Sequence, residues 1–144
     1  MSHQIDRRIR AGWISFNRYR AELYDYPTAS LDLKSRMVKS YVVEALLYGC
    51  VAWNPLKGDY QTLRAAHHRM LLRILGAWCR SWDHQILSYN LTLQRTDCES
   101  IETTMCARRL LWTGALIRMD NRVLPRRIMV GTFEYPGRRG RGRK

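Results

Sequence analysis

Residues 40–53 form the most apolar run in a chain that is otherwise dense with arginine. The run reads Ser-Tyr-Val-Val-Glu-Ala-Leu-Leu-Tyr-Gly-Cys-Val-Ala-Trp, and Glu44 is its only formal charge. A helix that crosses a bilayer needs about 20 apolar residues, whereas this run is shorter and is interrupted by Glu44 and Gly49. We therefore predict a buried central helix, closed by Gly49, which the rest of the chain covers.

Amphipathic patterns on both sides of this run predict an all-α fold, an irregular bundle of about five or six helices. The apolar residues recur at the spacing of a helix, and polar residues, proline and glycine separate the repeats. The predicted helices cover residues 4–24, 28 or 30 to 48, 59–76, 83–89, 100–119 and 123–130, and residues 90–97 are predicted to form a loop.

Polar side chains mark the starts of these helices, because a side-chain oxygen can accept an N–H group that has no partner inside the helix. Thr28 or Ser30 is predicted to cap the helix that contains the apolar run. Asp59 and Asp83 are predicted to cap the next two helices, and Gly76 lies at the end of the first of these. Asp120 and Asn121 end the helix over residues 100–119.

Apolar stripes predict which face of each helix is buried. Trp13 and Trp112 lie on such stripes and are predicted to be core residues. Gly114 predicts a close contact with another helix, because glycine inside a helix otherwise costs about 1 kcal/mol. The stripe of the first helix is Ile5, Ile9, Trp13, Phe16 and Leu23, and that of the helix over residues 100–119 is Ile101, Met105, Trp112, Ala115 and Met119.

The positive charge of the chain limits what it can bind. The 144 residues contain 25 Lys+Arg and 12 Asp+Glu, a formal net charge of +13, and 21 of the cations are arginine. Arginine makes planar, two-pronged contacts with phosphate, so this composition favours nucleic acid as a partner. We predict one helical domain over residues 1–134 and a disordered Arg/Gly-rich tail over residues 135–144, whose charge of +5 leaves +8 on the domain.

Catalytic motifs are not found in the sequence, and we predict that the chain is not an enzyme on its own and has no cofactor and no small-molecule substrate. Its carboxylates are scattered, whereas a polymerase or nuclease clusters them around two metal ions. Cys79, His84, Cys98 and Cys106, with His67 or His68, lack the close spacing of a zinc site. We interpret the cysteines as reduced, in an intracellular protein, nuclear or cytoplasmic and not secreted, without a membrane partner.

Arginines on the predicted helices and in the tail are the candidate nucleic-acid contacts, mostly to backbone phosphates. Trp78 and Trp82, which flank Arg80, are the candidates for stacking on bases. The candidate phosphate contacts are Arg64, Arg69, Arg73, Arg80, Arg108, Arg109, Arg118, Arg138, Arg139, Arg141, Arg143 and Lys144.

Several short motifs occur in an order that resembles the segment downstream of the polymerase core in reverse transcriptases of non-LTR (LINE-type) retrotransposons. Together they extend over about residues 7–144. They are Leu46-Leu47-Tyr48-Gly49 followed by Trp53, Arg69 with residues 72–76, residues 109–114 with Arg118-Met119, Leu124-Pro125-Arg126, and Gly137-Arg138-Arg139 to Arg141-Gly142-Arg143 in the tail.

This resemblance implies a helical, thumb-like region that lies against template and primer after the palm of the polymerase. The palm's Tyr-x-Asp-Asp motif is absent from these 144 residues. The chain therefore resembles the C-terminal part of a longer element protein, or the product of a decayed copy, with the upstream polymerase domains as a further partner. RNA, DNA or a hybrid duplex is the expected ligand.

Two other functions stay open at this level. One is a freestanding DNA-binding regulator with a helix-turn-helix formed by residues 59–76 and the short helix after Asp83, in which Gln85, Ser88 and Asn90 would contact bases. The other is a non-catalytic protein-interaction module, or a decayed product, whose incomplete core leaves residues 46–53 and Trp78 partly exposed.

Overall fold

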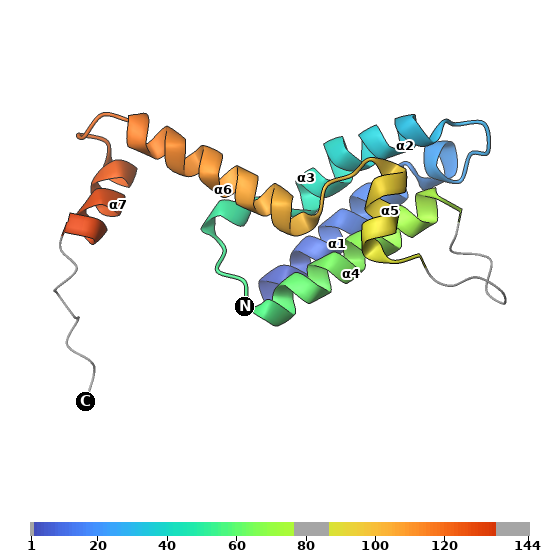
Figure 1. Cartoon of the computed structure of the whole chain (residues 1–144), viewed down its shortest axis with the longest axis horizontal. Helices are drawn as coiled ribbons and strands as arrows, with labels where there is room; N and C mark the ends of the chain where they lie inside the picture. Colours follow the sequence, from blue (N-terminus) through green and yellow to red (C-terminus); the bar gives the residue numbers. More distant parts are fainter. Residues whose placement is uncertain (1, 77–86, 135–144) are drawn as a thin grey trace. The chain divides into compact units, whose positions relative to one another are not determined.

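Helices make up all the regular structure in the part of the chain that the computed structural model describes, residues 2–76 and 87–134 (Figure 1). This confirms the predicted all-α fold. The helices are α1 (Ser2–Arg18), α2 (Leu31–Met37), α3 (Val43–Leu46), α4 (Lys57–Ile74), α5 (Tyr89–Thr96), α6 (Ile101–Arg118) and α7 (Leu124–Glu134), and π-helical turns over Arg20–Tyr24 and Val38–Val42 extend α1 and join α2 to α3.

The chain divides into two compact units, Met1–Cys106 and Ala107–Lys144, where the sequence predicts a single domain over residues 1–134. The boundary falls inside α6, so the first turns of this helix belong to the first unit and the rest to the second. The core cluster belongs to the first unit.

The apolar run is the centre of the first unit, as predicted. Val42, Leu46 and Leu47 are fully buried, and Trp53 is also buried. Helix α3 ends at Leu46, and Gly49 lies in the turn after it with a φ of 73°, the left-handed conformation that glycine adopts at helix ends. Helix α1 packs beside the run against α3 and α4 (Figure 1), so the run is covered by the two longest helices of this unit.

Gly12 sets how closely α1 approaches its neighbours. A methyl group in place of its hydrogen would lie 3.3 Å from Leu46 Cδ1 and 3.4 Å from Met70 Cε. The apolar residues of α1 surround this contact: Ile5 and Phe16 are buried, while Trp13 packs edge-on against Phe16 with ring centroids 5.6 Å apart. The predicted stripe of the first helix, including Trp13 as a core residue, is confirmed.

One of the predicted helix caps is confirmed, and another residue lies further into its helix than predicted. Ser30 caps α2 by accepting the N–H of Leu33 at 3.3 Å, which decides between Thr28 and Ser30. Asp59 is not the cap of α4, because the helix begins at Lys57 and Asp59 is its third residue. From there its carboxylate accepts the N–H of Leu56 at 2.9 Å, which still satisfies a free donor at the helix start.

The loop predicted over residues 90–97 is wrong, since Tyr89–Thr96 is helix α5. Ser88 caps it through the N–H of Leu91, and the buried side chains of Thr92 and Thr96 pack its inner face. Tertiary packing thus outweighs a composition with weak helix propensity. The helix predicted from Asp83 to Tyr89 does not reach its predicted end, because Leu87 and Ser88 are not helical, and residues 83–86 lie outside the described residues.

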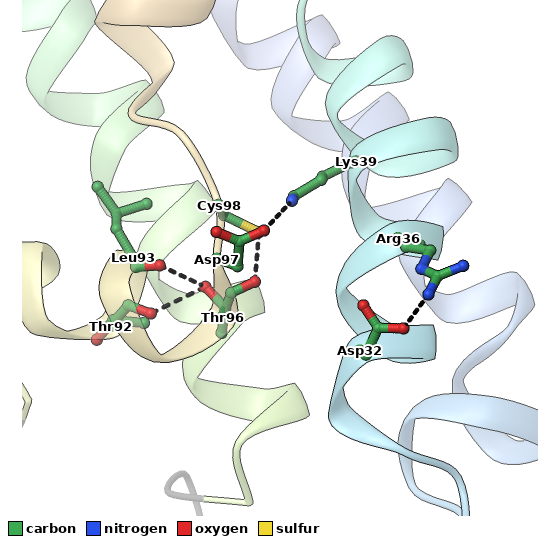
Figure 2. A network of polar contacts seen from close by, with 8 residues as sticks. All are labelled: Asp32, Arg36, Lys39, Thr92, Leu93, Thr96, Asp97 and Cys98. Carbon is green, nitrogen blue, oxygen red and sulfur yellow. Dashed lines mark hydrogen bonds and ion pairs between the residues drawn. The ribbon is translucent and has the colours of Figure 1, made fainter.

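The end of α5 is tied to the turn that joins α2 and α3 (Figure 2). Asp97 adopts a φ of 48°, and its carboxylate accepts a hydrogen bond from Lys39 Nζ at 3.2 Å. Aspartate tolerates this left-handed conformation better than most residues. The lysine also offsets the unfavourable position of an anion at a helix C-terminus. The same view shows Arg36 paired with Asp32 along α2.

The bounds of α6 confirm the helix predicted over residues 100–119, but the face predicted to be buried is only partly buried. Ile101 and Met105 are buried, whereas the Trp112 side chain is 46% exposed, so the prediction that Trp112 is a core residue is wrong. The prediction of close helix packing at Gly114 is also wrong, because the nearest atom to an added methyl group is Nη1 of Arg118 on the same helix, at 3.3 Å. Helix α7 includes the predicted residues 124–130 and continues to Glu134.

The buried run predicts the result of a cavity mutation. Leu46→Ala removes a fully buried side chain that contacts α1 at Gly12, and we expect it to lower the free energy of unfolding by about 2–5 kcal/mol. Denaturant unfolding followed by circular dichroism measures this change. Ile14→Ala, at an exposed position of α1, is the matched control and should change stability by less than about 0.5 kcal/mol. Equal effects of the two mutations would contradict a core at Leu46.

Candidate nucleic-acid interface

The three candidate arginines of α4 do not share one surface. Arg69 and Arg73 are one helical turn apart, but Arg64 lies on another face of the helix. Arg64 pairs with Glu102, with 2.7 Å between Nη2 and Oε1, and its guanidinium lies 5.3 Å from the centre of the Tyr89 ring. Because its charge is already neutralised, Arg64 is the weakest of the three as a phosphate contact.

Arg73 is directed toward α1 and Arg69 toward solvent. The Arg73 guanidinium lies 5.9 Å from the Trp13 ring and is half-buried, so part of its role is to pack α4 on α1. Arg69 is exposed. Of the predicted contacts on α4, Arg69 is therefore the one most accessible to a partner.

Among its described residues, the second unit contains three further predicted contacts and two exposed arginines that the sequence analysis missed. Arg108 and Arg109 are half-buried on α6, and Arg118 is exposed at its end. Arg122 and Arg127 are also exposed, beside and within α7. Their proximity in sequence to Arg118 is the signal that could have identified them.

Arg126 has a structural role in the second unit. Its Nη1 donates hydrogen bonds to the backbone oxygens of Ile117 and Met119 at the end of α6. A cation at this position satisfies carbonyl groups that have no partner inside the helix and interacts favourably with the helix dipole. It thereby links the start of α7 to the end of α6.

The net charge is distributed unequally between the two units. Met1–Cys106 contains fourteen Lys+Arg and ten Asp+Glu, a net charge of +4. Ala107–Lys144 contains eleven Lys+Arg and two Asp+Glu, a net charge of +9, and the two values add up to the +13 of the whole chain. The shorter unit thus carries more than twice the net charge of the longer one.

Several predicted site residues lie outside the described residues. Among the phosphate contacts these are Arg80, Arg138, Arg139, Arg141, Arg143 and Lys144, and among the stacking candidates Trp78 and Trp82. Gln85 of the helix-turn-helix alternative lies there as well. The other two candidate base contacts of this helix-turn-helix lie on or next to α5: Ser88 caps the helix, and Asn90 is exposed.

A hollow on α1 brings together basic residues that the sequence analysis did not select. Helix positions three and four apart share a face, which places Arg7 and Arg8 one turn after His3 and Gln4. The Arg8 guanidinium lies 5.0 Å from the centre of the Tyr48 ring, which is itself exposed. The residues that line the hollow are His3, Gln4, Arg7, Arg8 and Ala11.

A buried polar network joins α4 to the starts of α5 and α6. His67 Nδ1 and the Tyr89 hydroxyl are hydrogen bonded at 3.0 Å, and the same hydroxyl accepts the N–H of Ile101 at 3.2 Å. Ser100 Oγ accepts the N–H of Thr103. The N–H groups of Ile101 and Thr103, two donors at the start of α6, therefore both have side-chain acceptors. Burial lowers the pKa of His67 to about 4 and raises the pKa of Tyr89 to about 12, because it disfavours the charged form of each.

Three of the residues considered for zinc, His67, His68 and Cys98, are engaged in other contacts, and Cys106 is exposed. His68 Nε2 is hydrogen bonded to Thr92 Oγ1 at 3.1 Å, and Cys98 Sγ donates to the backbone oxygen of Thr96 at 3.5 Å (Figure 2). Cys79 and His84 lie outside the described residues. Within the described residues, no three His, Cys, Asp or Glu side chains are grouped as metal ligands.

Comparisons of the chain with protein-family models, with curated proteins and with solved structures find no match. The resemblance to reverse transcriptases therefore stays a prediction from the motifs. Among the described helices, none has the length and apolar character needed to cross a membrane.

The buried network predicts a loss of stability in acid. His67 stays neutral in the folded protein down to about pH 4, whereas in the unfolded chain it binds a proton below its ordinary pKa of 6.5. The unfolded state therefore binds more protons between these values, and stability falls as pH decreases through this range. From pH 7 to pH 5 we expect His67 to contribute a loss of roughly 2 kcal/mol.

Denaturant unfolding at several pH values measures this effect. His67→Gln removes the titrating group and keeps a hydrogen-bonding side chain beside Tyr89, so its free energy of unfolding should depend less on pH over the same range. His3→Gln, at an exposed position, is the control and should retain the wild-type dependence. An unchanged pH dependence in His67→Gln would contradict the assignment.

Proposed function

We propose that this protein binds nucleic acid through backbone phosphates and that the unit Ala107–Lys144 makes most of the contacts. The observation that carries the proposal is the net charge of +9 in those 38 residues, against +4 in the preceding 106. Sequence-independent nucleic-acid binding depends on such local concentrations of arginine, because each phosphate contact releases condensed counterions. Arginine is also the cation best suited to two-pronged phosphate contacts.

The ion pairs of the first unit support this assignment. Four of its cations pair with carboxylates in the described structure, which makes these four less available for contacts with phosphates. The pairs are Arg20–Asp25, Arg36–Asp32, Lys39–Asp97 and Arg64–Glu102. In the second unit Arg118, Arg122 and Arg127 are exposed near the junction of α6 and α7, where they can reach phosphates.

In this proposal the protein acts as a binding region and has no catalytic role of its own. The motif order that resembles LINE-type reverse transcriptases supports a position next to a polymerase palm, with the basic unit against the primer–template duplex. RNA, DNA or a hybrid of the two would then be the ligand, since phosphate contacts position a duplex without reading its sequence. Primer extension with the isolated chain should give no product, and templated synthesis would contradict this part of the proposal.

Neutralising the exposed arginines tests which unit binds. The triple variant Arg118→Gln, Arg122→Gln and Arg127→Gln should weaken binding to a labelled duplex. It should also make the slope of log K against log salt concentration shallower by about 0.9 for each phosphate that the variant no longer neutralises. Fluorescence anisotropy over a series of salt concentrations measures both quantities.

The matched control removes the same charge from the first unit. Arg7→Gln, Arg10→Gln and Arg95→Gln are all exposed there, and together they should change the slope less than the variant of the second unit. Equal changes would assign binding to the net charge of the whole chain. If the wild-type chain is folded and binds no nucleic acid even at low salt, the proposed function is wrong.

Exposed apolar side chains support a protein-interaction module as the second candidate function. In the second unit Leu110, Ile117, Leu124 and Ile128 are each more than 60% exposed, which is unusual for so many large apolar residues in a short segment. This candidate predicts a folded oligomer that does not bind nucleic acid. Light scattering after size-exclusion chromatography, combined with the binding titration, separates it from the first.

A further inference from the structure

We propose that Trp112 stacks on an unpaired base, so that the second unit prefers single-stranded over double-stranded nucleic acid. This inference rests on the proposed function, because it needs a nucleic-acid ligand, and it adds the class of ligand and a residue that contacts bases. Its starting point is a residue that the sequence pattern assigns to the core and that the structure exposes.

The position of Trp112 on α6 is the first support. On the same face of the helix, Ile101 and Met105 are buried in the first unit. Trp112 continues this face two turns later, beyond the boundary at Cys106, and 46% of its side chain is accessible. An exposed indole ring is a large apolar surface that gains free energy when another ring covers it.

The charges around Trp112 are the second support. Arg108 and Arg109 precede it by four and three residues, so both lie beside it on the helix surface. Arg118, Arg122 and Arg127 follow on the same unit. An aromatic ring among arginines matches the arrangement by which proteins bind single strands, with bases stacked on the ring and phosphates held by the cations.

The geometry of stacking explains the preference for a single strand. The face of a base is covered by its neighbours in a duplex, and it becomes accessible in a single strand, a loop or a frayed end. The phosphates remain accessible in both forms. Phosphate contacts alone would therefore bind either form, whereas Trp112 adds binding free energy only where a base can leave its stack.

Charge complementarity favours nucleic acid over a second copy of the chain as the partner of this ring. The unit around Trp112 carries a net charge of +9, so two such units brought face to face repel each other. A nucleic-acid strand has the opposite charge, and its bases supply rings of suitable size. Self-association is accordingly an outcome that would contradict the inference.

The experiment compares a labelled oligothymidylate with a duplex of the same length by fluorescence anisotropy. For Trp112→Ala we expect binding to oligothymidylate to weaken about 5- to 150-fold, the range for the loss of one stacked base, while binding to the duplex stays unchanged. The salt dependence should also stay unchanged, because stacking releases no counterions. Trp112→Phe should restore most of the affinity, since a smaller ring still stacks.

Leu111→Ala is the matched control, because it truncates a neighbouring exposed apolar residue of the same helix and leaves the ring in place. It should bind both ligands as the wild type does. Circular dichroism of each variant reports the helical content. Quenching of tryptophan fluorescence by oligothymidylate, present in the wild type and reduced in Trp112→Phe, identifies the ring that contacts the base.

The outcomes that contradict the inference are distinguishable. If the wild-type chain binds neither ligand, the proposed function is wrong and the inference with it. If the wild type binds both but Trp112→Ala equals Leu111→Ala, only the role of Trp112 is wrong. A Trp112→Ala variant that converts an oligomer into a monomer would assign the ring to self-association and would also overturn the inference.

Discussion

Burial of the apolar run against α1 and α4 is the interaction on which the rest of the first unit depends. Leu46 and Leu47 are completely enclosed, and Gly12 allows α1 to approach Leu46 and Met70 without an intervening side chain. Burying apolar surface is the dominant favourable term in folding, and the long helices needed for it also carry exposed arginines. The core thus supports a charged surface.

Polar contacts determine how the shorter helices attach to that core. The Tyr89 hydroxyl is hydrogen bonded to both His67 and the N–H of Ile101, so α5 and α6 begin at positions set by one half-buried ring. Asp97 in a left-handed conformation then pairs with Lys39 at the end of α5. These contacts join residues far apart in sequence, and no local pattern predicts them. Inside this basic protein, burial holds the pKa of His67 well below its ordinary value.

Local patterns predicted much of the fold because the strongest helices are amphipathic. The stripe from Ile5 to Phe16, a cap at Thr28 or Ser30 and the glycine after the central helix follow from side-chain periodicity and backbone geometry alone. Prediction failed at Tyr89–Thr96, where buried threonines stabilise a helix with weak intrinsic propensity. It also failed at Trp112, because periodicity identifies an apolar face but not whether another element covers it.

The sequence by itself determined the all-α fold, the central run and the excess of arginine, because composition and periodicity are local properties. It did not determine which arginines are engaged, because the Arg64–Glu102 pair, the contact of Arg73 with Trp13 and the capping of α6 by Arg126 arise only when different helices meet. The tertiary structure also decided that the boundary between the units falls within α6. A residue's charge is fixed by its chemistry, but its accessibility depends on the packing around it.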